Sequence, residues 1–227
     1  MSTTRTEAPT DPTLTDDAES LDAEGVIARM VERFHPRLFL ACSFQQEESV
    51  LIDLLLKVEP RARIFTLDTS VLFPETYETW KQMEARYGIE IETFSGISLE
   101  DQAAAHGEAL WERNPDQCCA IRKVAPLQEA LSQVDGWITG VRRDQAPTRA
   151  GTPKIGWDKR HGIWKASPLA DWSERDVWRY IHANELIYNP LHDRGYASIG
   201  CTHCTVPAAD RSGRWAGNGK VECGLHG

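Results

Sequence analysis

The sequence predicts an α/β protein in which helices flank a mostly parallel β-sheet and an irregular tail follows at the C-terminus. Short apolar runs alternate with longer segments of helical periodicity, which is the pattern of βαβ units. Polar turns follow three of the apolar runs, at Ser43–Ser49, Asp68–Ser70 and Gly140–Arg149. Parallel sheets bind ligands beyond the carboxyl ends of their strands, so we expect a ligand at these turns. From Pro190 onward the periodicity is lost, which predicts the irregular tail.

Each strand and helix of this arrangement has a local signal. Apolar runs of strand length are found at residues 37–42, 64–67, 89–95 and 136–143. Segments that predict helices are found at residues 21–34, 50–58, 74–88 and 115–132. Pro36 ends the first of these helices, whereas Pro74 opens the third and Gly88 closes it. We therefore expect four strands with helices between them.

The segment that follows the fourth strand predicts a hairpin and one more helix. Residues 153–169 have the pattern of two short strands around a turn. Ser173 and Asp176 form a capping box for a helix over residues 174–184. At the other end, the first twenty residues are rich in Thr, Pro and acidic residues, which predicts disorder. The expected organisation is a disordered tail at 1–20, an α/β domain at 21–189 and a C-terminal tail at 190–227.

Composition and charge exclude some classes of protein. The chain of 227 residues has a net charge of −9, so a general nucleic-acid binder is not expected. No stretch approaches the roughly 18 apolar residues of a membrane span, and the N-terminus lacks the apolar core of a secretory signal. We therefore expect a cytoplasmic protein with no membrane or nucleic-acid partner. Thiols stay reduced in that compartment, so the six cysteines indicate metal binding or catalysis more than disulfides.

Four of the six cysteines fall into two close groups, the adjacent pair Cys118 and Cys119 and the C-x-x-C pair Cys201 and Cys204. Four such thiolates can bind zinc or an iron–sulfur cluster. Adjacent side chains on a helix diverge by about 100°, which hampers two thiolates that must converge on one zinc ion. The same two thiolates can reach two different irons of a cluster. The spacing therefore favours a cluster, with zinc and four plain buried thiols as the alternatives.

The remaining two cysteines stand alone in the sequence. Cys42 ends an apolar run, and a small buried thiol is its expected role. Cys223 lies in a glycine-containing tail, where a buried structural thiol is not expected. A mobile nucleophile is one interpretation of Cys223, although its spacing alone does not distinguish this from an idle thiol. His226, three residues later, either assists this thiol or is an ordinary terminal residue.

Seven motifs together resemble the assimilatory adenylylsulfate reductases, the thioredoxin-dependent iron–sulfur branch of the APS and PAPS reductase family. The motifs are LDT at 67–69, PET at 74–76, CCAIRKVAPL at 118–127, TGVRRDQAPTR at 139–149, YNPLHDRGYASIGCTHCT at 188–205, RSGRW at 211–215 and ECGLHG at 222–227. They run in the order of the family from about residue 35 to the end of the chain. The first twenty residues lie outside the resemblance.

The resemblance implies a fold like that of the adenine-nucleotide alpha-hydrolases, with a nucleotide-binding domain at 21–189 and a cluster-binding and catalytic tail at 190–227. It implies that adenylyl sulfate and reduced thioredoxin, or a glutaredoxin-like reductant, give sulfite, AMP and oxidised reductant. Cys223 would be the nucleophile, and a cysteine S-sulfonate would be the intermediate. One [4Fe–4S] cluster per chain would be held by Cys118, Cys119, Cys201 and Cys204.

The resemblance also implies a set of seven residues that contact the substrate. These are Lys123, Arg211 and Arg214 around the sulfate, Arg149 near the phosphate or ribose, Ser43 near the phosphate or sugar, and Leu67 and Gly140 beside the adenine. His226 would be an auxiliary residue. A cluster held in this way can act through its charge and by tying the tail to the sheet, and we favour this role over electron transfer.

Two alternative functions are kept. A phosphoadenylylsulfate reductase, or an enzyme that accepts both nucleotides, differs from the first hypothesis only in a 3′-phosphate on the substrate. The second alternative, from another class, is a nucleotide-binding regulator whose C-terminal tail is held by a zinc ion. This hypothesis predicts that Cys223 is dispensable. ATP hydrolysis is disfavoured, because the turn SFQQEES at 43–49 lacks the SGGxDS pattern of ATP pyrophosphatases.

Overall fold

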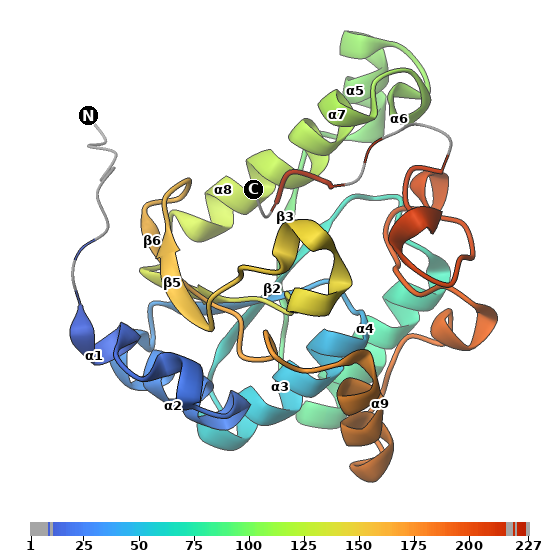
Figure 1. The fold of residues 1–227 in the computed structure, drawn as a ribbon. Helices are drawn as coiled ribbons and strands as arrows, with labels where there is room; N and C mark the ends of the chain where they lie inside the picture. The colour runs from blue at the N-terminus through green and yellow to red at the C-terminus, as the bar shows by residue number, and fades with distance from the viewer. Residues whose placement is uncertain (1–8, 10, 217–219, 221, 226–227) are drawn as a thin grey trace. The chain divides into compact units, whose positions relative to one another are not determined.

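The computed structural model describes residues 9, 11–216, 220 and 222–225 (Figure 1). Its strands form a six-stranded sheet in the order β3-β2-β1-β4-β6-β5. The chain divides into two compact units. The first comprises residues 1–42, 46–65 and 131–187, and the second comprises residues 43–45, 66–130 and 188–227. Each unit is discontinuous in sequence, so the division differs from the consecutive segments that the sequence suggested.

The first unit contains the parallel centre of the sheet. Its strands are β1 (Leu38–Cys42), β4 (Gly136–Ile138), β5 (Ile155–Asp158) and β6 (Ile163–Ala166). β1 runs parallel to β4, with Leu38 opposite Gly136, and β4 runs parallel to β6. β5 and β6 pair antiparallel as the predicted hairpin. The expectation of a mostly parallel sheet is confirmed.

The helices of the first unit are α1 (Pro12–Thr15), α2 (Ala23–Phe34), α3 (Gln46–Val58) and α9 (Glu174–Ala183). The apolar face of α2 is fully buried, because Val26, Ile27 and Met30 are 0% exposed. The capping box of α9 forms as predicted, since Ser173 and Asp176 exchange side-chain and backbone hydrogen bonds.

Two expectations for the first unit were wrong in detail. The helix expected at 50–58 begins already at Gln46, and the polar residues of its first turn are buried. The described part of the segment expected to be disordered, residues 9 and 11–20, contains α1 and a 3₁₀ turn at Ala18–Ser20. Leu14 is 1% exposed, so one apolar side chain fastens this segment to the core. Residues 1–8 and 10 lie outside the described residues.

The second unit carries β3 (Glu92–Ser95) and the helices α4 (Pro74–Tyr87), α5 (Leu99–His106), α6 (Leu110–Arg113) and α7 (Pro115–Cys119). A π-helical turn (Ala120–Val124) follows α7 and leads into α8 (Ala125–Leu131), so the helix expected over 115–132 is present with an irregular centre. The strand β2 (Arg63–Asp68) precedes α4. Gly88 closes α4 as predicted, with a left-handed φ of 64° that glycine adopts without strain.

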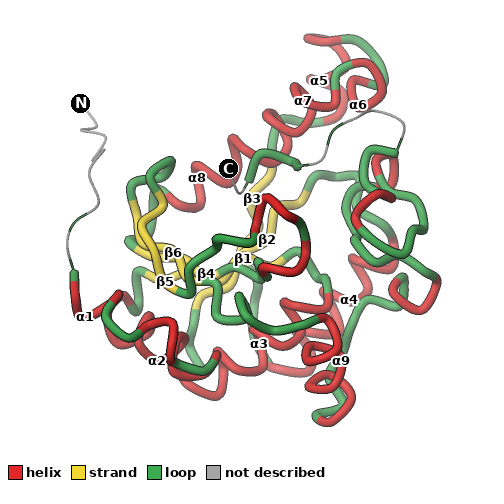
Figure 2. Tube along the Cα trace, in the orientation of Figure 1, coloured by secondary structure: helices red, strands yellow, loops and turns green. Residues whose placement is uncertain are grey.

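The chain from Pro190 onward is irregular, as the sequence predicts. Its described residues contain 3₁₀ turns at His192–Arg194, Thr202–Cys204 and Arg211–Gly213 but no α-helix or β-strand (Figure 2). Isolated bridges join Tyr196 to Ala208 and Thr205 to Arg214, which fold the segment back on itself. None of the helices in the described part of the chain has the length and apolar character needed to cross a membrane.

Candidate functional site

Four cysteines of the second unit surround one hollow. Cys118 and Cys119 lie at the end of α7, which Asn114 caps by accepting a hydrogen bond from the backbone N–H of Gln117. Cys201 precedes the 3₁₀ turn that Cys204 ends. All four side chains line the same hollow, so the structure brings together the two groups that are far apart in the sequence.

The thiols differ in their electrostatic surroundings. Burial is the main cause that raises the pKa of the Cys118 and Cys119 thiols, and burial with the neighbouring Cys201 raises the pKa of Cys204 to about 11. Burial also acts on Cys201, but Lys123 and a hydrogen bond with Thr69 lower the pKa of this thiol. Four thiolates in one hollow therefore require positive charge, which bound iron ions would supply.

The donor set of the hollow is four cysteine thiols. Among the residues that the structure describes, no group of three or more His, Cys, Asp or Glu side chains is arranged so that it could hold a metal ion. The four thiols instead lie around the wall of a shared hollow. Soft thiolates spread in this way suit an iron–sulfur cluster, whose separate irons each take one ligand.

Three residues that support the hollow were not singled out from the sequence: Thr69, Arg122 and Trp111. His203, which lies between the C-x-x-C thiols, is expected from the sequence to fill space or support the site rather than to bind a metal. The Thr69 hydroxyl lies 3.3 Å from the Cys201 sulfur, and the backbone oxygen of Thr69 accepts a hydrogen bond of 2.7 Å from Arg122 Nη1. The ring of His203 stacks on Trp111, with centroids 4.1 Å apart. Thr69 and Arg122 lie within the LDT and CCAIRK motifs, but the sequence does not indicate which residue each of them contacts.

Lys123 and Cys223 meet at the same site. Burial alone would lower the pKa of Lys123, but the nearby Cys201 and Cys223 raise it above its ordinary value. Cys223 is a free, partly exposed cysteine, and Gly224 after it adopts a left-handed φ of 81°. The structure thus brings the predicted nucleophile to the predicted sulfate-binding lysine and the four other thiols.

Arg211 and Arg214 converge on one hydroxyl group. Nη1 of Arg211 donates to Ser198 Oγ at 3.4 Å, and Nη1 of Arg214 donates to the same atom at 3.3 Å. Arg214 is 7% exposed, and its Nε is buried without a hydrogen-bond partner among the described residues. Arg211 also forms an ion pair of 3.2 Å with Glu222, the residue before the nucleophile. Two guanidinium groups therefore lie together at Ser198 and place positive charge there.

Ser43 and Leu67 also belong to the second unit. Gln45 donates to Ser43 Oγ at 3.2 Å, and its own side-chain oxygen accepts a hydrogen bond of 2.8 Å from the backbone N–H of Ile199. This contact ties the turn after β1 to the segment that leads to Cys201. Leu67 is half-buried near the end of β2.

Gly140 and Arg149 lie in the first unit, within a network of polar side chains. Arg149 is 8% exposed and donates to Gln145 Oε1 at 2.5 Å, while Gln145 Nε2 donates to Glu47 at 3.0 Å. A Cβ atom on Gly140 would lie 2.8 Å from Glu47 Cβ, closer than two such atoms approach, so this position favours glycine. His226 lies outside the described residues.

Comparisons with known proteins agree with this arrangement. Residues 37–207 match the family described as "Phosphoadenosine phosphosulfate reductase domain". A Lysinibacillus sphaericus protein named adenosine 5′-phosphosulfate reductase is 51% identical over 202 residues, which cover 86% of each chain. A Gloeobacter violaceus protein named phosphoadenosine 5′-phosphosulfate reductase is 46% identical over 216 residues, which cover 92% of this chain and 90% of that one.

A solved structure shows the same fold. It is the phosphate complex of phosphoadenylyl-sulfate (PAPS) reductase from Candida auris, with a TM-score of 0.76 and 30% identity. The match covers 88% of this chain and 99% of that chain. As its motifs predict, the chain therefore belongs to the phosphoadenosine phosphosulfate reductase family, with the nucleotide alpha-hydrolase-like fold.

Proposed function

We propose that the protein reduces adenylyl sulfate to sulfite and AMP through an S-sulfonate on Cys223, with reduced thioredoxin as the electron donor. One observation carries this proposal: the residue after Cys223 lies against the residue after Lys123, since a Cβ on Gly224 would lie 3.7 Å from Val124 Cγ2, and Cys223 helps to raise the pKa of Lys123. A thiol nucleophile next to a fixed cation is what attack on an anionic sulfate requires. The Lysinibacillus relative, 51% identical, carries the name of this activity.

Fixed positive charge allows the two anions to meet. Lys123 and the pair Arg211 and Arg214 would bind the sulfate oxygens, and the buried Nε of Arg214 offers a donor for one of them. Arg149 would bind the nucleotide near its phosphate or ribose, with Ser43 at the phosphate or sugar. Leu67 and Gly140 would lie beside the adenine.

The proposed reaction balances in two steps. The Cys223 thiolate forms a bond to the sulfate sulfur, the bond from sulfur to the bridging oxygen breaks, and AMP leaves. A thiolate of thioredoxin then attacks the Cys223 sulfur, sulfite leaves with the electron pair, and the second thioredoxin thiol resolves the mixed disulfide. Both electrons come from the dithiol, so a reductant of this class is sufficient. We place this reaction in the cytoplasm, where dithiols are kept reduced.

We further propose that Cys118, Cys119, Cys201 and Cys204 hold one [4Fe–4S] cluster. Their places around one hollow support a group that takes one thiolate ligand at each of its irons. When bound, the cluster would tie the C-terminal segment to the helix that carries Lys123.

Iron content tests this assignment. Protein prepared without oxygen is expected to be brown and to contain iron and acid-labile sulfide in equal amounts. Cys204→Ala is expected to lose most of both, whereas Cys42→Ala, which changes a buried thiol of β1, is expected to keep them. Colourless protein with stoichiometric zinc would contradict the cluster and would favour the zinc-stapled regulator instead.

The substrate is tested with the two nucleotides that the named relatives suggest. We expect kcat/KM with adenylyl sulfate to exceed that with its 3′-phosphorylated form by roughly tenfold or more. Steady-state sulfite release with thioredoxin measures both. The name of the Gloeobacter relative favours the second nucleotide as the alternative substrate. Faster turnover of the 3′-phosphorylated form would contradict the proposal, and equal turnover would identify an enzyme that accepts both.

A further inference from the structure

The segment before α2 is bound to the first unit by several specific contacts. Leu14 is 1% exposed, and Arg29 of α2 donates to the backbone oxygen of Asp16 at 2.9 Å. Arg29 also forms an ion pair of 2.9 Å with Asp17. This segment precedes residue 37, where the match to the family model begins.

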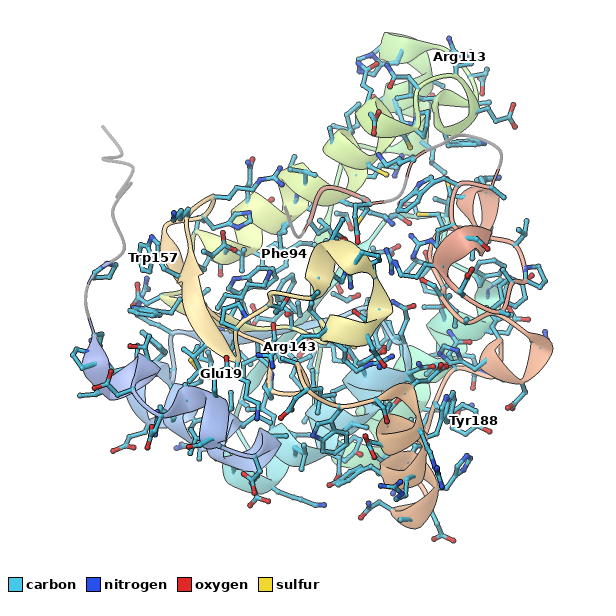
Figure 3. The ribbon with its side chains drawn as sticks, in the orientation of Figure 1. Glu19, Phe94, Arg113, Arg143, Trp157 and Tyr188 are labelled. Carbon is cyan, nitrogen blue, oxygen red and sulfur yellow. The ribbon has the colours of Figure 1, made fainter. Side chains whose placement is uncertain are left out.

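Glu19 in this segment bridges two points of a distant loop. Its Oε2 accepts a hydrogen bond of 2.6 Å from Arg143 Nη2, and its Oε1 accepts one of 2.9 Å from the backbone N–H of Lys154 (Figure 3). The Lys154 ammonium is buried and donates a hydrogen bond of 2.5 Å to the backbone oxygen of Leu21, two residues after Glu19. The carboxylate thus holds both ends of the loop at residues 143–154.

Arg143 closes this loop. Its Nε donates to the backbone oxygen of Thr152 at 2.8 Å, while Nη2 of the same guanidinium is held by Glu19. Arg149 lies between these two residues, and its backbone N–H donates to Ala146 at 2.9 Å. The backbone N–H of Thr152 in turn donates to Arg149 at 2.9 Å. The position of Arg149 therefore depends on a loop whose two ends are both hydrogen-bonded to the Glu19 carboxylate, in addition to the bond between Arg143 and Thr152.

We propose that Glu19 is a positioning residue for the nucleotide: through Arg143 and the Lys154 amide it holds the 143–154 loop so that Arg149 is ready to bind. This inference rests on the proposed function, in which Arg149 contacts the nucleotide. A loop that is ordered before binding avoids the cost of ordering on binding. When the contacts of Glu19 are lost, only the molecules whose loop has the binding conformation can bind the nucleotide. The apparent affinity for the nucleotide is then the intrinsic affinity multiplied by that fraction of molecules.

Hydrogen exchange of the loop and steady-state kinetics test the proposal together. In Glu19→Gln, amides within residues 143–154 are expected to exchange faster, while those of β1 are unchanged. KM for adenylyl sulfate is expected to rise roughly tenfold, with kcat changed by less than about twofold. Glu32→Gln is the matched control, because Glu32 is an exposed carboxylate of α2, and wild-type behaviour is expected from it.

A second variant shows whether Glu19 acts through Arg143. Arg143→Gln is expected to raise KM as well, and the double variant is expected to raise it by less than the two single changes combined, because both remove the ion pair between Glu19 and Arg143. Unchanged exchange of the loop in Glu19→Gln overturns the proposal. Faster exchange with an unchanged KM also overturns it. If wild type forms no sulfite from adenylyl sulfate, the proposed function fails instead, and the exchange measurement still tests the fastening.

Discussion

Replacing Cys223 with serine is expected to lower turnover of adenylyl sulfate by more than about a thousandfold. The proposed first step needs a thiolate, and a serine hydroxyl is ionised far less at neutral pH. Intact mass after addition of adenylyl sulfate without reductant isolates this step. Wild type is expected to gain the mass of one SO₃ group, and Cys223→Ser to gain none.

Cys42→Ala is the matched control for this measurement. Cys42 is a buried thiol at the end of β1, and it is 4% exposed. The control is expected to gain the same mass as wild type, since bond formation does not involve this sulfur. An SO₃ adduct on Cys223→Ser would assign the nucleophile to another cysteine. A wild-type protein that forms sulfite but no adduct would contradict the covalent intermediate itself.

The parts of the fold that were predicted correctly depend on residue patterns that span only a few positions of the chain. Ser173 and Asp176 are three residues apart, and the hydrogen bonds of their capping box form as expected. The early start of α3 was missed because its signal is not local. Glu47 can be buried in the first turn because Arg142 and Gln145, 95 and 98 positions later, donate to it at 2.9 Å and 3.0 Å. The helix α1 has four residues, too few to show a period.

The same distinction applies to the site. The sequence allowed four cysteines to be grouped, because thiols spaced in this way commonly bind one metal group together. The structure places all four at one hollow: Cys118, Cys119, Cys201 and Cys204. The contacts of their neighbours could not be predicted in this way. The hydrogen bond of Thr69 to Cys201 joins residues 132 positions apart and depends on how β2 and the C-terminal segment pack.

Replacing Lys123 with methionine is expected to slow formation of the S-sulfonate by about a hundredfold or more. Methionine keeps most of the length of the side chain but removes the charge that the thiolate and the sulfate share in the proposed first step. Single-turnover mass measurement reports this rate without thioredoxin. Lys123→Arg keeps a cation of different shape and is expected to fall between wild type and Lys123→Met.

If Lys123 acts at the sulfate, replacing it should leave the binding of a nucleotide without sulfate unchanged. AMP lacks the sulfate, so Lys123→Met is expected to bind AMP as wild type does, whereas Arg149→Met is expected to bind it more weakly. Lys81→Met, at an exposed position of α4, is the control for loss of a lysine. Because Lys123 lies close to Cys201, the iron content of each variant has to match that of wild type. If Lys123→Met keeps its iron yet forms the adduct at the wild-type rate, its charge does not act on the sulfate. The two arginines that meet at Ser198 would then have to supply the positive charge alone.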